Sequence, residues 1–164
     1  NVARLYRDCC VLSIWEGTTD VLASDTLRVL KGKSGEEVLN ALDRWITTSL
    51  RNSASQYPGH QTALAAFWSQ LRPSISGSTP EHLLPKARDL TFDIANVIMG
   101  ALLLAEANAG STSASIEVCT RFLLDKRIIA QGNPGKGKMP VSAALSVNQK
   151  IVYGDDDKSE SSKL

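Results

Sequence analysis

The most constraining feature of this sequence is the run of twelve residues from Ile94 to Ala105, which contains no charged side chain. A helix that is apolar on every side is stable in water only where other elements surround it. The flanking residues favour a long helix from about Pro80 to Ala109, because Pro85 falls near its first turn and Gly110 follows its end. We therefore expect this helix to lie at the centre of a bundle.

Amphipathic patterns elsewhere in the chain supply the helices that could surround this one. Apolar residues recur at helical spacing in residues 2–9, 18–30, 34–50, 61–71 and 113–129. Arg72-Pro73 is typical of a helix end, because a proline disfavours helical backbone in the residue before it. Trp45 lies among the apolar positions of its segment, so we expect it in the core. The sequence thus predicts an all-α fold, a helical bundle.

The chain changes character after Ala130. Residues 131–138 are rich in glycine, lack periodicity and are typical of a flexible linker. Residues 141–152 are compatible with a short helix or a strand, and the acidic, serine-rich segment after Gly154 favours disorder. We therefore expect a helical domain at residues 1–130, followed by a flexible linker and disordered tail at residues 131–164.

Charge and residue spacing argue against several function classes. The net charge is +1, and only 16 basic and 13 acidic residues lie outside the segment from Gly154 to Leu164, so nucleic acid is not an expected partner. The three cysteines lack the spacing of a disulfide framework or a zinc site, and neither His60 nor His82 has a second ligand three or four residues away. No continuous apolar run reaches the roughly 20 residues of a membrane span, so we expect no metal and no membrane partner.

A short stretch before the second expected helix combines residue types that suit chemistry. Trp15 offers an apolar wall and Glu16 a proton acceptor. Gly17 has no Cβ and lets a ligand come close to the backbone, while Thr18 and Thr19 add hydroxyl and N–H groups where a helix begins. Such a helix start suits a polar or phosphate-bearing ligand, which makes this stretch the candidate site.

These residues also carry a resemblance to a known family. The blocks Ala3-Arg4-Leu5-Tyr6-Arg7-Asp8 and Ile14-Trp15-Glu16-Gly17-Thr18-Thr19-Asp20-Val21-Leu22 resemble the carboxy-terminal domain of flavin-dependent acyl-CoA dehydrogenases, at the family's spacing. The run from Asp25 to Leu30 is similar to the AidB-like branch of that family, whose bacterial members respond to DNA alkylation. The resemblance implies a helical bundle and, since the chain starts at Asn1 just before the motif, a longer flavoprotein.

The resemblance also implies roles for individual residues. Glu16 would be the catalytic base, and Gly17 and Trp15 would contact the substrate. The residues expected against FAD are Thr18, Thr19 and Asp20. The implied reaction is the α,β-dehydrogenation of an acyl-CoA thioester in fatty-acid β-oxidation, with the remaining domains of the parent protein holding most of the FAD. Family members are usually homo-oligomers, so self-association is expected.

Arg28 has two interpretations. Asp25 and Arg28 are three residues apart on the expected helix, which predicts an intrahelical ion pair. The family resemblance implies instead that Arg28 contacts the CoA moiety of the substrate.

Three other functions remain open. A peroxisomal acyl-CoA oxidase would pass electrons from the flavin to oxygen instead of to an electron-transfer protein. An AidB-like flavoprotein would bind nucleic acid through basic residues, of which the candidates are Arg121, Lys126, Arg127, Lys136 and Lys138. A catalytically inactive helical interaction module would retain the motif only as scaffold.

The last three residues, Ser162-Lys163-Leu164, match the peroxisomal import signal. The signal must be a free, extended end, and the acidic, serine-rich segment before it favours such an end. We therefore expect a peroxisomal location and an import receptor as a partner, in agreement with an acyl-CoA substrate.

Overall fold

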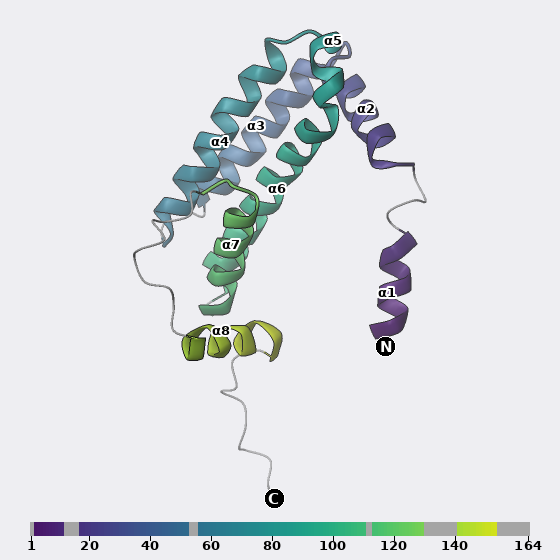
Figure 1. Ribbon diagram of the computed structural model, residues 1–164. Helices are drawn as coiled ribbons and strands as arrows, with labels where there is room; N and C mark the ends of the chain where they lie inside the picture. The colour runs from purple at the N-terminus through teal and green to yellow at the C-terminus, as the bar shows by residue number, and fades with distance from the viewer. Residues whose placement is uncertain (1, 12–16, 53–55, 111–112, 130–140, 154–164) are drawn as a thin grey trace, which may run out of the picture. The chain divides into compact units, whose positions relative to one another are not determined.

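The computed structural model describes residues 2–11, 17–52, 56–110, 113–129 and 141–153. Within these ranges the regular structure is entirely helical (Figure 1), which confirms the predicted all-α class. The helices are α1 (Val2–Val11), α2 (Thr19–Leu30), α3 (Gly35–Asn52), α4 (Pro58–Ser76), α5 (Pro80–Leu83), η1 (Leu84–Lys86, a 3₁₀ turn), α6 (Ala87–Ala109), α7 (Ser113–Asp125) and α8 (Val141–Tyr153).

The chain forms two compact units, and α3, α4 and α6 contribute to both. The first unit comprises residues 1–45 and 68–96, and the second comprises residues 46–67 and 97–164. Helix α1 belongs to the first unit, but none of its side chains is buried.

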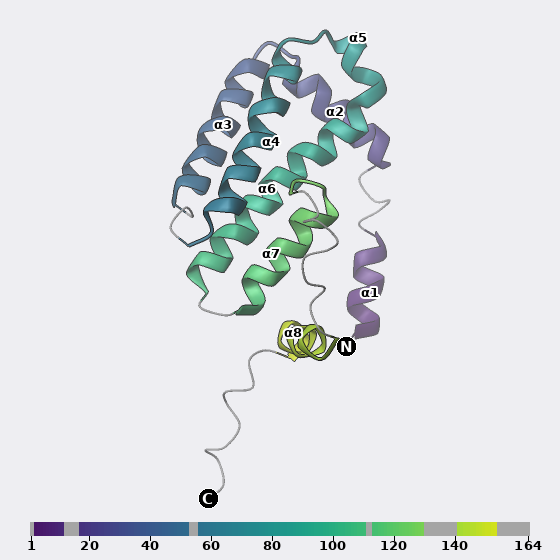
Figure 2. The same cartoon turned by 60° about the vertical axis from the view of Figure 1, so that its left-hand side comes forward.

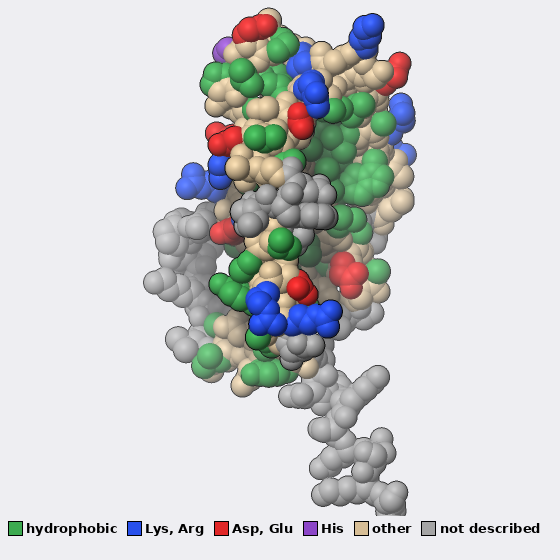
Figure 3. Space-filling view, turned by 90° about the vertical axis from the view of Figure 1, so that its right-hand side faces the viewer, with side chains coloured by type: hydrophobic (Ala, Val, Ile, Leu, Met, Phe, Trp, Pro, Cys, Tyr) green, Lys and Arg blue, Asp and Glu red, His purple; other side chains and the backbone are tan. Residues whose placement is uncertain are grey.

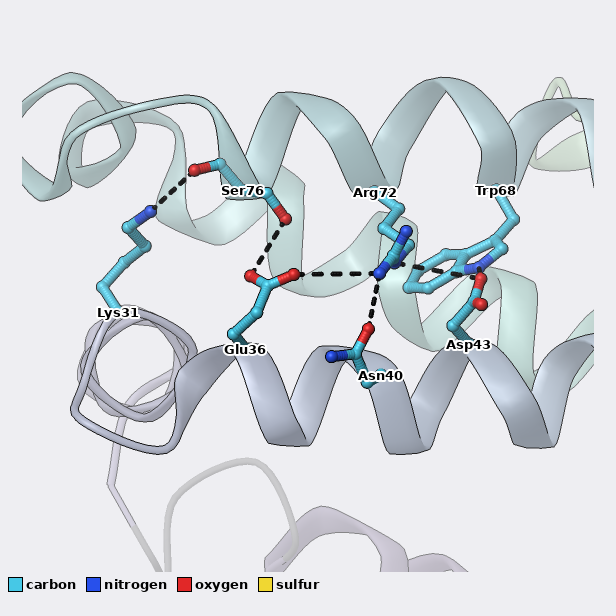
Figure 4. Close-up of polar contacts among 7 residues, drawn as sticks. All are labelled: Lys31, Glu36, Asn40, Asp43, Trp68, Arg72 and Ser76. Atoms are coloured by element: carbon cyan, nitrogen blue, oxygen red, sulfur yellow. Dashed lines mark hydrogen bonds and ion pairs between the residues drawn. The ribbon is translucent and has the colours of Figure 1, made fainter.

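A polar seam joins α3 to α4 in the first unit (Figure 4). Trp68 donates its indole N–H to Asp43 Oδ1 at 2.8 Å, and Arg72 donates to Asn40 Oδ1 at 2.6 Å. The Ser76 hydroxyl and a carboxylate oxygen of Glu36 are 3.4 Å apart. Residues later in α3 contact residues earlier in α4, so the two segments run antiparallel.

The end of α4 is capped from a distance by Lys31. Its ammonium donates to the carbonyl oxygens of Ile75 at 3.1 Å and Ser76 at 3.3 Å. The last carbonyl groups of a helix have no intrahelical partner, and a cation at this end also offsets the helix dipole. Lys31 therefore fixes the carboxyl end of α2 beside that of α4.

Close apolar packing holds the second unit together. Gly100 on α6 lies where a Cβ atom would come within 2.7 Å of Leu64 on α4 and 3.0 Å of Leu123 on α7. Both leucines are fully buried, as are Val97, Ala101 and Cys119. The predicted apolar run therefore does supply a core helix in this unit.

Helix α7 ends in a motif that normally needs glycine. Arg127 has φ 57°, its N–H bonds to Leu124 O, and the Ile128 N–H bonds to Leu123 O. These two bonds are those of a Schellman motif with Arg127 in the left-handed position. The helix expected up to Ile129 therefore stops at Asp125.

Helix α8 settles the open alternative for residues 141–152 in favour of a helix. It contacts α7, as Figures 1 and 2 show, and Arg121 on α7 donates to Asn148 Oδ1 at 2.7 Å. The segment thus packs against α7 within the second unit, although the boundary drawn at residue 130 itself stays a prediction.

Two prolines act differently from the sequence expectation. The expected end at Arg72-Pro73 is wrong, because α4 continues to Ser76 with Pro73 inside it. Contacts between Arg72 and α3 hold this residue in helical backbone against its local preference. The expected continuous helix from Pro80 is also wrong, because Pro85 has no N–H and the chain tightens into the η1 turn before α6 begins.

Trp45 was expected in the core but is 40% exposed, whereas Trp68 is only 4% exposed. Helical spacing places both on partly apolar faces. The buried Trp68 has a hydrogen-bond acceptor for its indole N–H in Asp43.

The stretch of residues 80–109 is long and apolar enough to cross a membrane, by length and composition only. Polar residues interrupt this stretch, so a count of continuous apolar residues underestimates how apolar it is. Core helices of water-soluble domains meet the same criteria, and Val97, Ala101 and Leu104 are fully buried within the second unit.

Candidate functional site

The described part of the candidate site begins at Gly17, while Trp15 and Glu16 lie outside the described residues. Gly17 has φ 116°, a backbone conformation that residues with a Cβ atom rarely adopt. Thr18 follows in extended backbone, with φ −67° and ψ 157°, and α2 begins at Thr19. The backbone at position 17, two residues before the helix, therefore favours a glycine.

The amino end of α2 keeps polar groups available. Thr18 makes no side-chain capping hydrogen bond, although its carbonyl accepts from the Leu22 N–H at 3.1 Å. The first N–H groups of a helix have no intrahelical acceptor and carry the positive end of its dipole. The Thr18 hydroxyl and these N–H groups can therefore donate to the polar part of a cofactor.

Asp20, in the first turn of α2, pairs with a residue that the sequence did not single out. Arg88 Nη1 lies 3.2 Å from Asp20 Oδ1, and the Arg88 guanidinium lies 5.8 Å from the centre of the Phe92 ring. Both charged side chains are more than half exposed, so the pair is weak. The two residues are 68 positions apart, and no sequence pattern indicates that they meet.

A hollow of about 360 Å³ lies beside this ion pair. It is bordered by Asp20, Ala23, Ser24, Leu84, Pro85, Ala87, Arg88 and Asp89. The Ser24 hydroxyl donates to the Asp20 carbonyl at 2.8 Å. Polar groups thus line the hollow from both α2 and the start of α6.

Arg28 lies further along α2 and does form the predicted intrahelical ion pair. Its Nη2 is 3.0 Å from Asp25 Oδ1, and both side chains are mostly exposed. Arg28 also borders a second hollow of about 450 Å³ between α2 and α5. This hollow is lined by Ser24, Leu27, Arg28, Lys31, Gly32, Pro80, Glu81 and Leu84. Sequence patterns missed it, because the η1 turn that brings Leu84 to its edge was not expected.

The basic residues proposed for nucleic-acid binding are partly engaged. Arg121 Nε is 2.7 Å from Glu117 Oε1, and Lys126 Nζ is 2.7 Å from Asp125 Oδ2. Lys136 and Lys138 lie outside the described residues. The neighbouring carboxylates offset the charge that phosphate binding would need.

The two histidines lie apart from any group of potential metal ligands. Within the described ranges, no three His, Cys, Asp or Glu side chains gather in a metal-binding arrangement. His60 Nε2 lies 2.8 Å from Thr120 Oγ1, and partial burial lowers the pKa of His60 below 6.5. Because the Thr120 hydroxyl donates to Ile116 O, its oxygen accepts from His60. This contact joins α4 to α7 within the second unit.

The fold and the candidate site define a helical domain with a glycine turn and an open helix start. Two comparisons agree on where such a domain is found. Residues 29–153 match the family described as "Acyl-CoA dehydrogenase 11 C-terminal domain-like". The chain is 30% identical over 173 residues to "Acyl-CoA dehydrogenase family member 11" of Caenorhabditis elegans, an alignment that covers 98% of the chain and 27% of that relative.

The chain therefore belongs to the acyl-CoA dehydrogenase 11 C-terminal domain-like family. It spans about a quarter of the length of the curated relative. No solved structure matches it. The family match begins within α2 and ends with α8, so it leaves the residues from Trp15 to Asp20 outside.

Proposed function

We propose that this chain is the carboxy-terminal helical part of an FAD-dependent acyl-CoA dehydrogenase, which catalyses the α,β-dehydrogenation of an acyl-CoA thioester in β-oxidation. The carrying observation is the geometry that directly follows Glu16: the Gly17 turn at φ 116° and the open start of α2. The name of the relative supports the same chemistry.

The described residues offer the types of hydrogen-bonding groups that a flavin needs. Gly17 would let the substrate approach the backbone, while Thr18, Thr19 and the first N–H groups of α2 offer donors to the polar edge of the flavin. Asp20 would accept hydrogen bonds from the flavin, and Arg88 would hold the Asp20 side chain in place. FAD, when bound, accepts the hydride that leaves the substrate.

Glu16 would act on the other half of the reaction, as the base that takes the α-proton of the acyl-CoA. An α C–H bond is weakly acidic, so the developing oxyanion needs hydrogen bonds aimed at its charge. An apolar acyl chain and the Trp15 ring would desolvate the Glu16 carboxylate and make it a stronger base.

The test uses the full-length parent protein in anaerobic flavin bleaching by acyl-CoA substrates of several chain lengths. Glu16→Gln should retain the flavin and lose at least a hundredfold in bleaching rate, whereas Glu37→Gln, an exposed glutamate on α3, should bleach at the normal rate. An unchanged rate in Glu16→Gln would remove Glu16 from this role. A parent protein that holds no flavin would contradict the proposed function altogether.

A peroxisomal acyl-CoA oxidase is the second candidate, and Ser162-Lys163-Leu164 is the feature that favours it. Oxygen consumption with acyl-CoA, measured beside electron transfer to an artificial acceptor, distinguishes the oxidase from the dehydrogenase. Removing the three residues from a fluorescent full-length fusion should leave it cytosolic, and a truncated fusion that still enters peroxisomes would contradict the location.

We also propose that the parent protein forms a homo-oligomer, as the resemblance implies. Exposed apolar side chains support self-association, among them Met99 and Leu102 on α6. Sedimentation of the full-length protein at micromolar concentration tests it, and a monomer would contradict it.

A further inference from the structure

The hollow between α2 and α5 is a second site of a different character from the start of α2. An α-helix rises about 1.5 Å per residue, so Arg28 lies roughly 12 Å along the axis from Asp20. The volume of about 450 Å³ falls in the range of small-molecule pockets, which are mostly apolar with a few placed polar groups.

The body of the hollow is apolar and the charge is concentrated on one wall. Leu27 is buried, and Leu84, on the η1 turn, is 57% exposed at its edge. Arg28, in the last turn of α2, and Lys31, the residue that directly follows α2, are three positions apart and both line the hollow. Figure 3 shows apolar side chains with Lys and Arg side chains close by, in the upper part of the face where α2 lies.

Both cations keep donors for a ligand. A lysine ammonium has three donors, and two carbonyl oxygens of α4 accept from Lys31. Among the described residues no carboxylate forms an ion pair with Lys31, and Arg28 contacts Asp25 through one nitrogen–oxygen pair between exposed groups. An exposed pair of this kind is weak, so the acid group of a ligand can replace Asp25 readily.

Glu81 is the carboxylate on the lining, and it is engaged locally. Its own backbone N–H and the Thr79 hydroxyl lower the pKa of Glu81. Its charge is thereby held at the first turn of α5, and the lining retains an excess of one positive charge, with Arg28 and Lys31 against Glu81.

We propose that this hollow binds an amphipathic monocarboxylate, whose acid group meets Arg28 and Lys31 and whose apolar body covers Leu27 and Leu84. The site requires no flavin and no reaction, so it stands apart from the proposed function. A polyphosphate ligand is less well matched, because Glu81 on the lining and Asp25 beside Arg28 would repel additional negative charge.

The test is a titration of the ¹⁵N-labelled 164-residue chain, followed by amide chemical shifts. The probes are octanoate and 2-naphthoate, which differ in the shape of the apolar body, and their neutral amides. We expect at least one carboxylate to shift the amides of Lys31, Gly32 and Leu84 saturably, and its amide to bind at least fivefold more weakly.

Two variants and a control sharpen the result. Arg28→Gln should weaken the carboxylate at least fivefold, and Leu84→Trp, which fills the hollow from an exposed position, should abolish its binding. Arg51→Gln, an exposed arginine on α3, should bind as the unaltered chain does. An unaltered amide spectrum away from each mutated residue establishes that the variant is folded.

Three outcomes would overturn the proposal: no saturable shift with either carboxylate, equal affinity for the neutral amides, or no loss in Arg28→Gln. Coenzyme A itself is the further probe. If coenzyme A shifts these amides and neither carboxylate does, the monocarboxylate site is wrong while the role of Arg28 toward acyl-CoA gains support.

Discussion

Both units of this domain have a buried apolar core, but the contacts between their helices differ in their polar part. In the first, charged and polar side chains reach between helices: Lys31 to the end of α4, Arg72 to α3, and Trp68 to Asp43. In the second, Gly100 lets leucines approach the backbone of α6, and the buried groups are almost all apolar. The difference teaches that one helix, such as α4, can pack by two kinds of contact along its length.

The largest effect should come from the second unit, on replacing Gly100 by valine. The added atoms would begin 2.7 Å from Leu64 Cδ2 and 3.0 Å from Leu123 Cδ2, so the core must shift at a cost of about 2–3 kcal/mol. Chemical denaturation measures the loss. Gly59→Val is the control, because no atom lies within 4 Å of its Cβ position, and it should change stability by less than about 0.5 kcal/mol. Equal losses for the two variants would refute the close packing.

The first unit should respond most to Trp68→Phe. This change removes the 2.8 Å hydrogen bond to Asp43 and some buried volume, and we expect a loss of about 1–2 kcal/mol in the free energy of unfolding. Trp45→Phe changes an exposed ring by the same atoms and serves as the control, with little expected effect. Should Trp45→Phe prove the more damaging of the two, the polar seam would not be the main support of this unit.

A stabilising change is expected at the end of α7. Arg127 has φ 57°, where glycine carries no steric penalty, so Arg127→Gly should raise the unfolding free energy by up to about 1 kcal/mol. Thermal unfolding would show a higher midpoint, whereas Arg127→Ala should not stabilise. A destabilised glycine variant would mean that the Arg127 side chain contributes more than its backbone strain costs.

The smallest effect concerns the polar contact inside the apolar unit, between His60 and Thr120. Burial lowers the folded-state pKa of His60 below 6.5, so the unfolded chain binds a proton more readily. The neutral His60 ring therefore contributes fully to the stability of the folded chain above pH 6.5. This contribution is lost as the pH falls through 6.5 toward the folded-state pKa. Between pH 7.5 and 5.5, His60→Gln should lose less stability than the unaltered chain, by under about 2 °C in thermal midpoint. If the thermal midpoints of the variant and the unaltered chain fall in parallel with pH, the titration of His60 does not affect the stability of this unit.

Helical periodicity predicted the existence of most helices because it depends only on which residues face inward. It could not place their ends where distant contacts override local preference. Arg72 precedes a proline yet stays helical because α3 holds its side chain, and Pro85 breaks the segment after Pro80 although it was expected within a first helical turn. Trp45 and Trp68 illustrate the same limit for the core, since the contact between Trp68 and Asp43, 25 residues apart, cannot be inferred from spacing.

The candidate site was predictable only in its local part. The start of α2 near Thr18 follows from adjacent residues and is present, whereas the positive φ of Gly17 was not predicted. Arg88 joins Asp20 from 68 residues away, and Leu84 reaches the second hollow through an unexpected turn, so neither could be inferred from spacing. The roles of Glu16 and Trp15 remain predictions from the sequence.

The left-handed turn at Gly17 also limits how this stretch can drift over generations. Every substitution at that position, whatever the codon change, adds a Cβ atom to a backbone at φ 116°. At Gly59 the same genetic change meets open space. A substitution at position 59 therefore costs little, whereas one at position 17 strains the backbone unless the path of the chain into α2 changes with it.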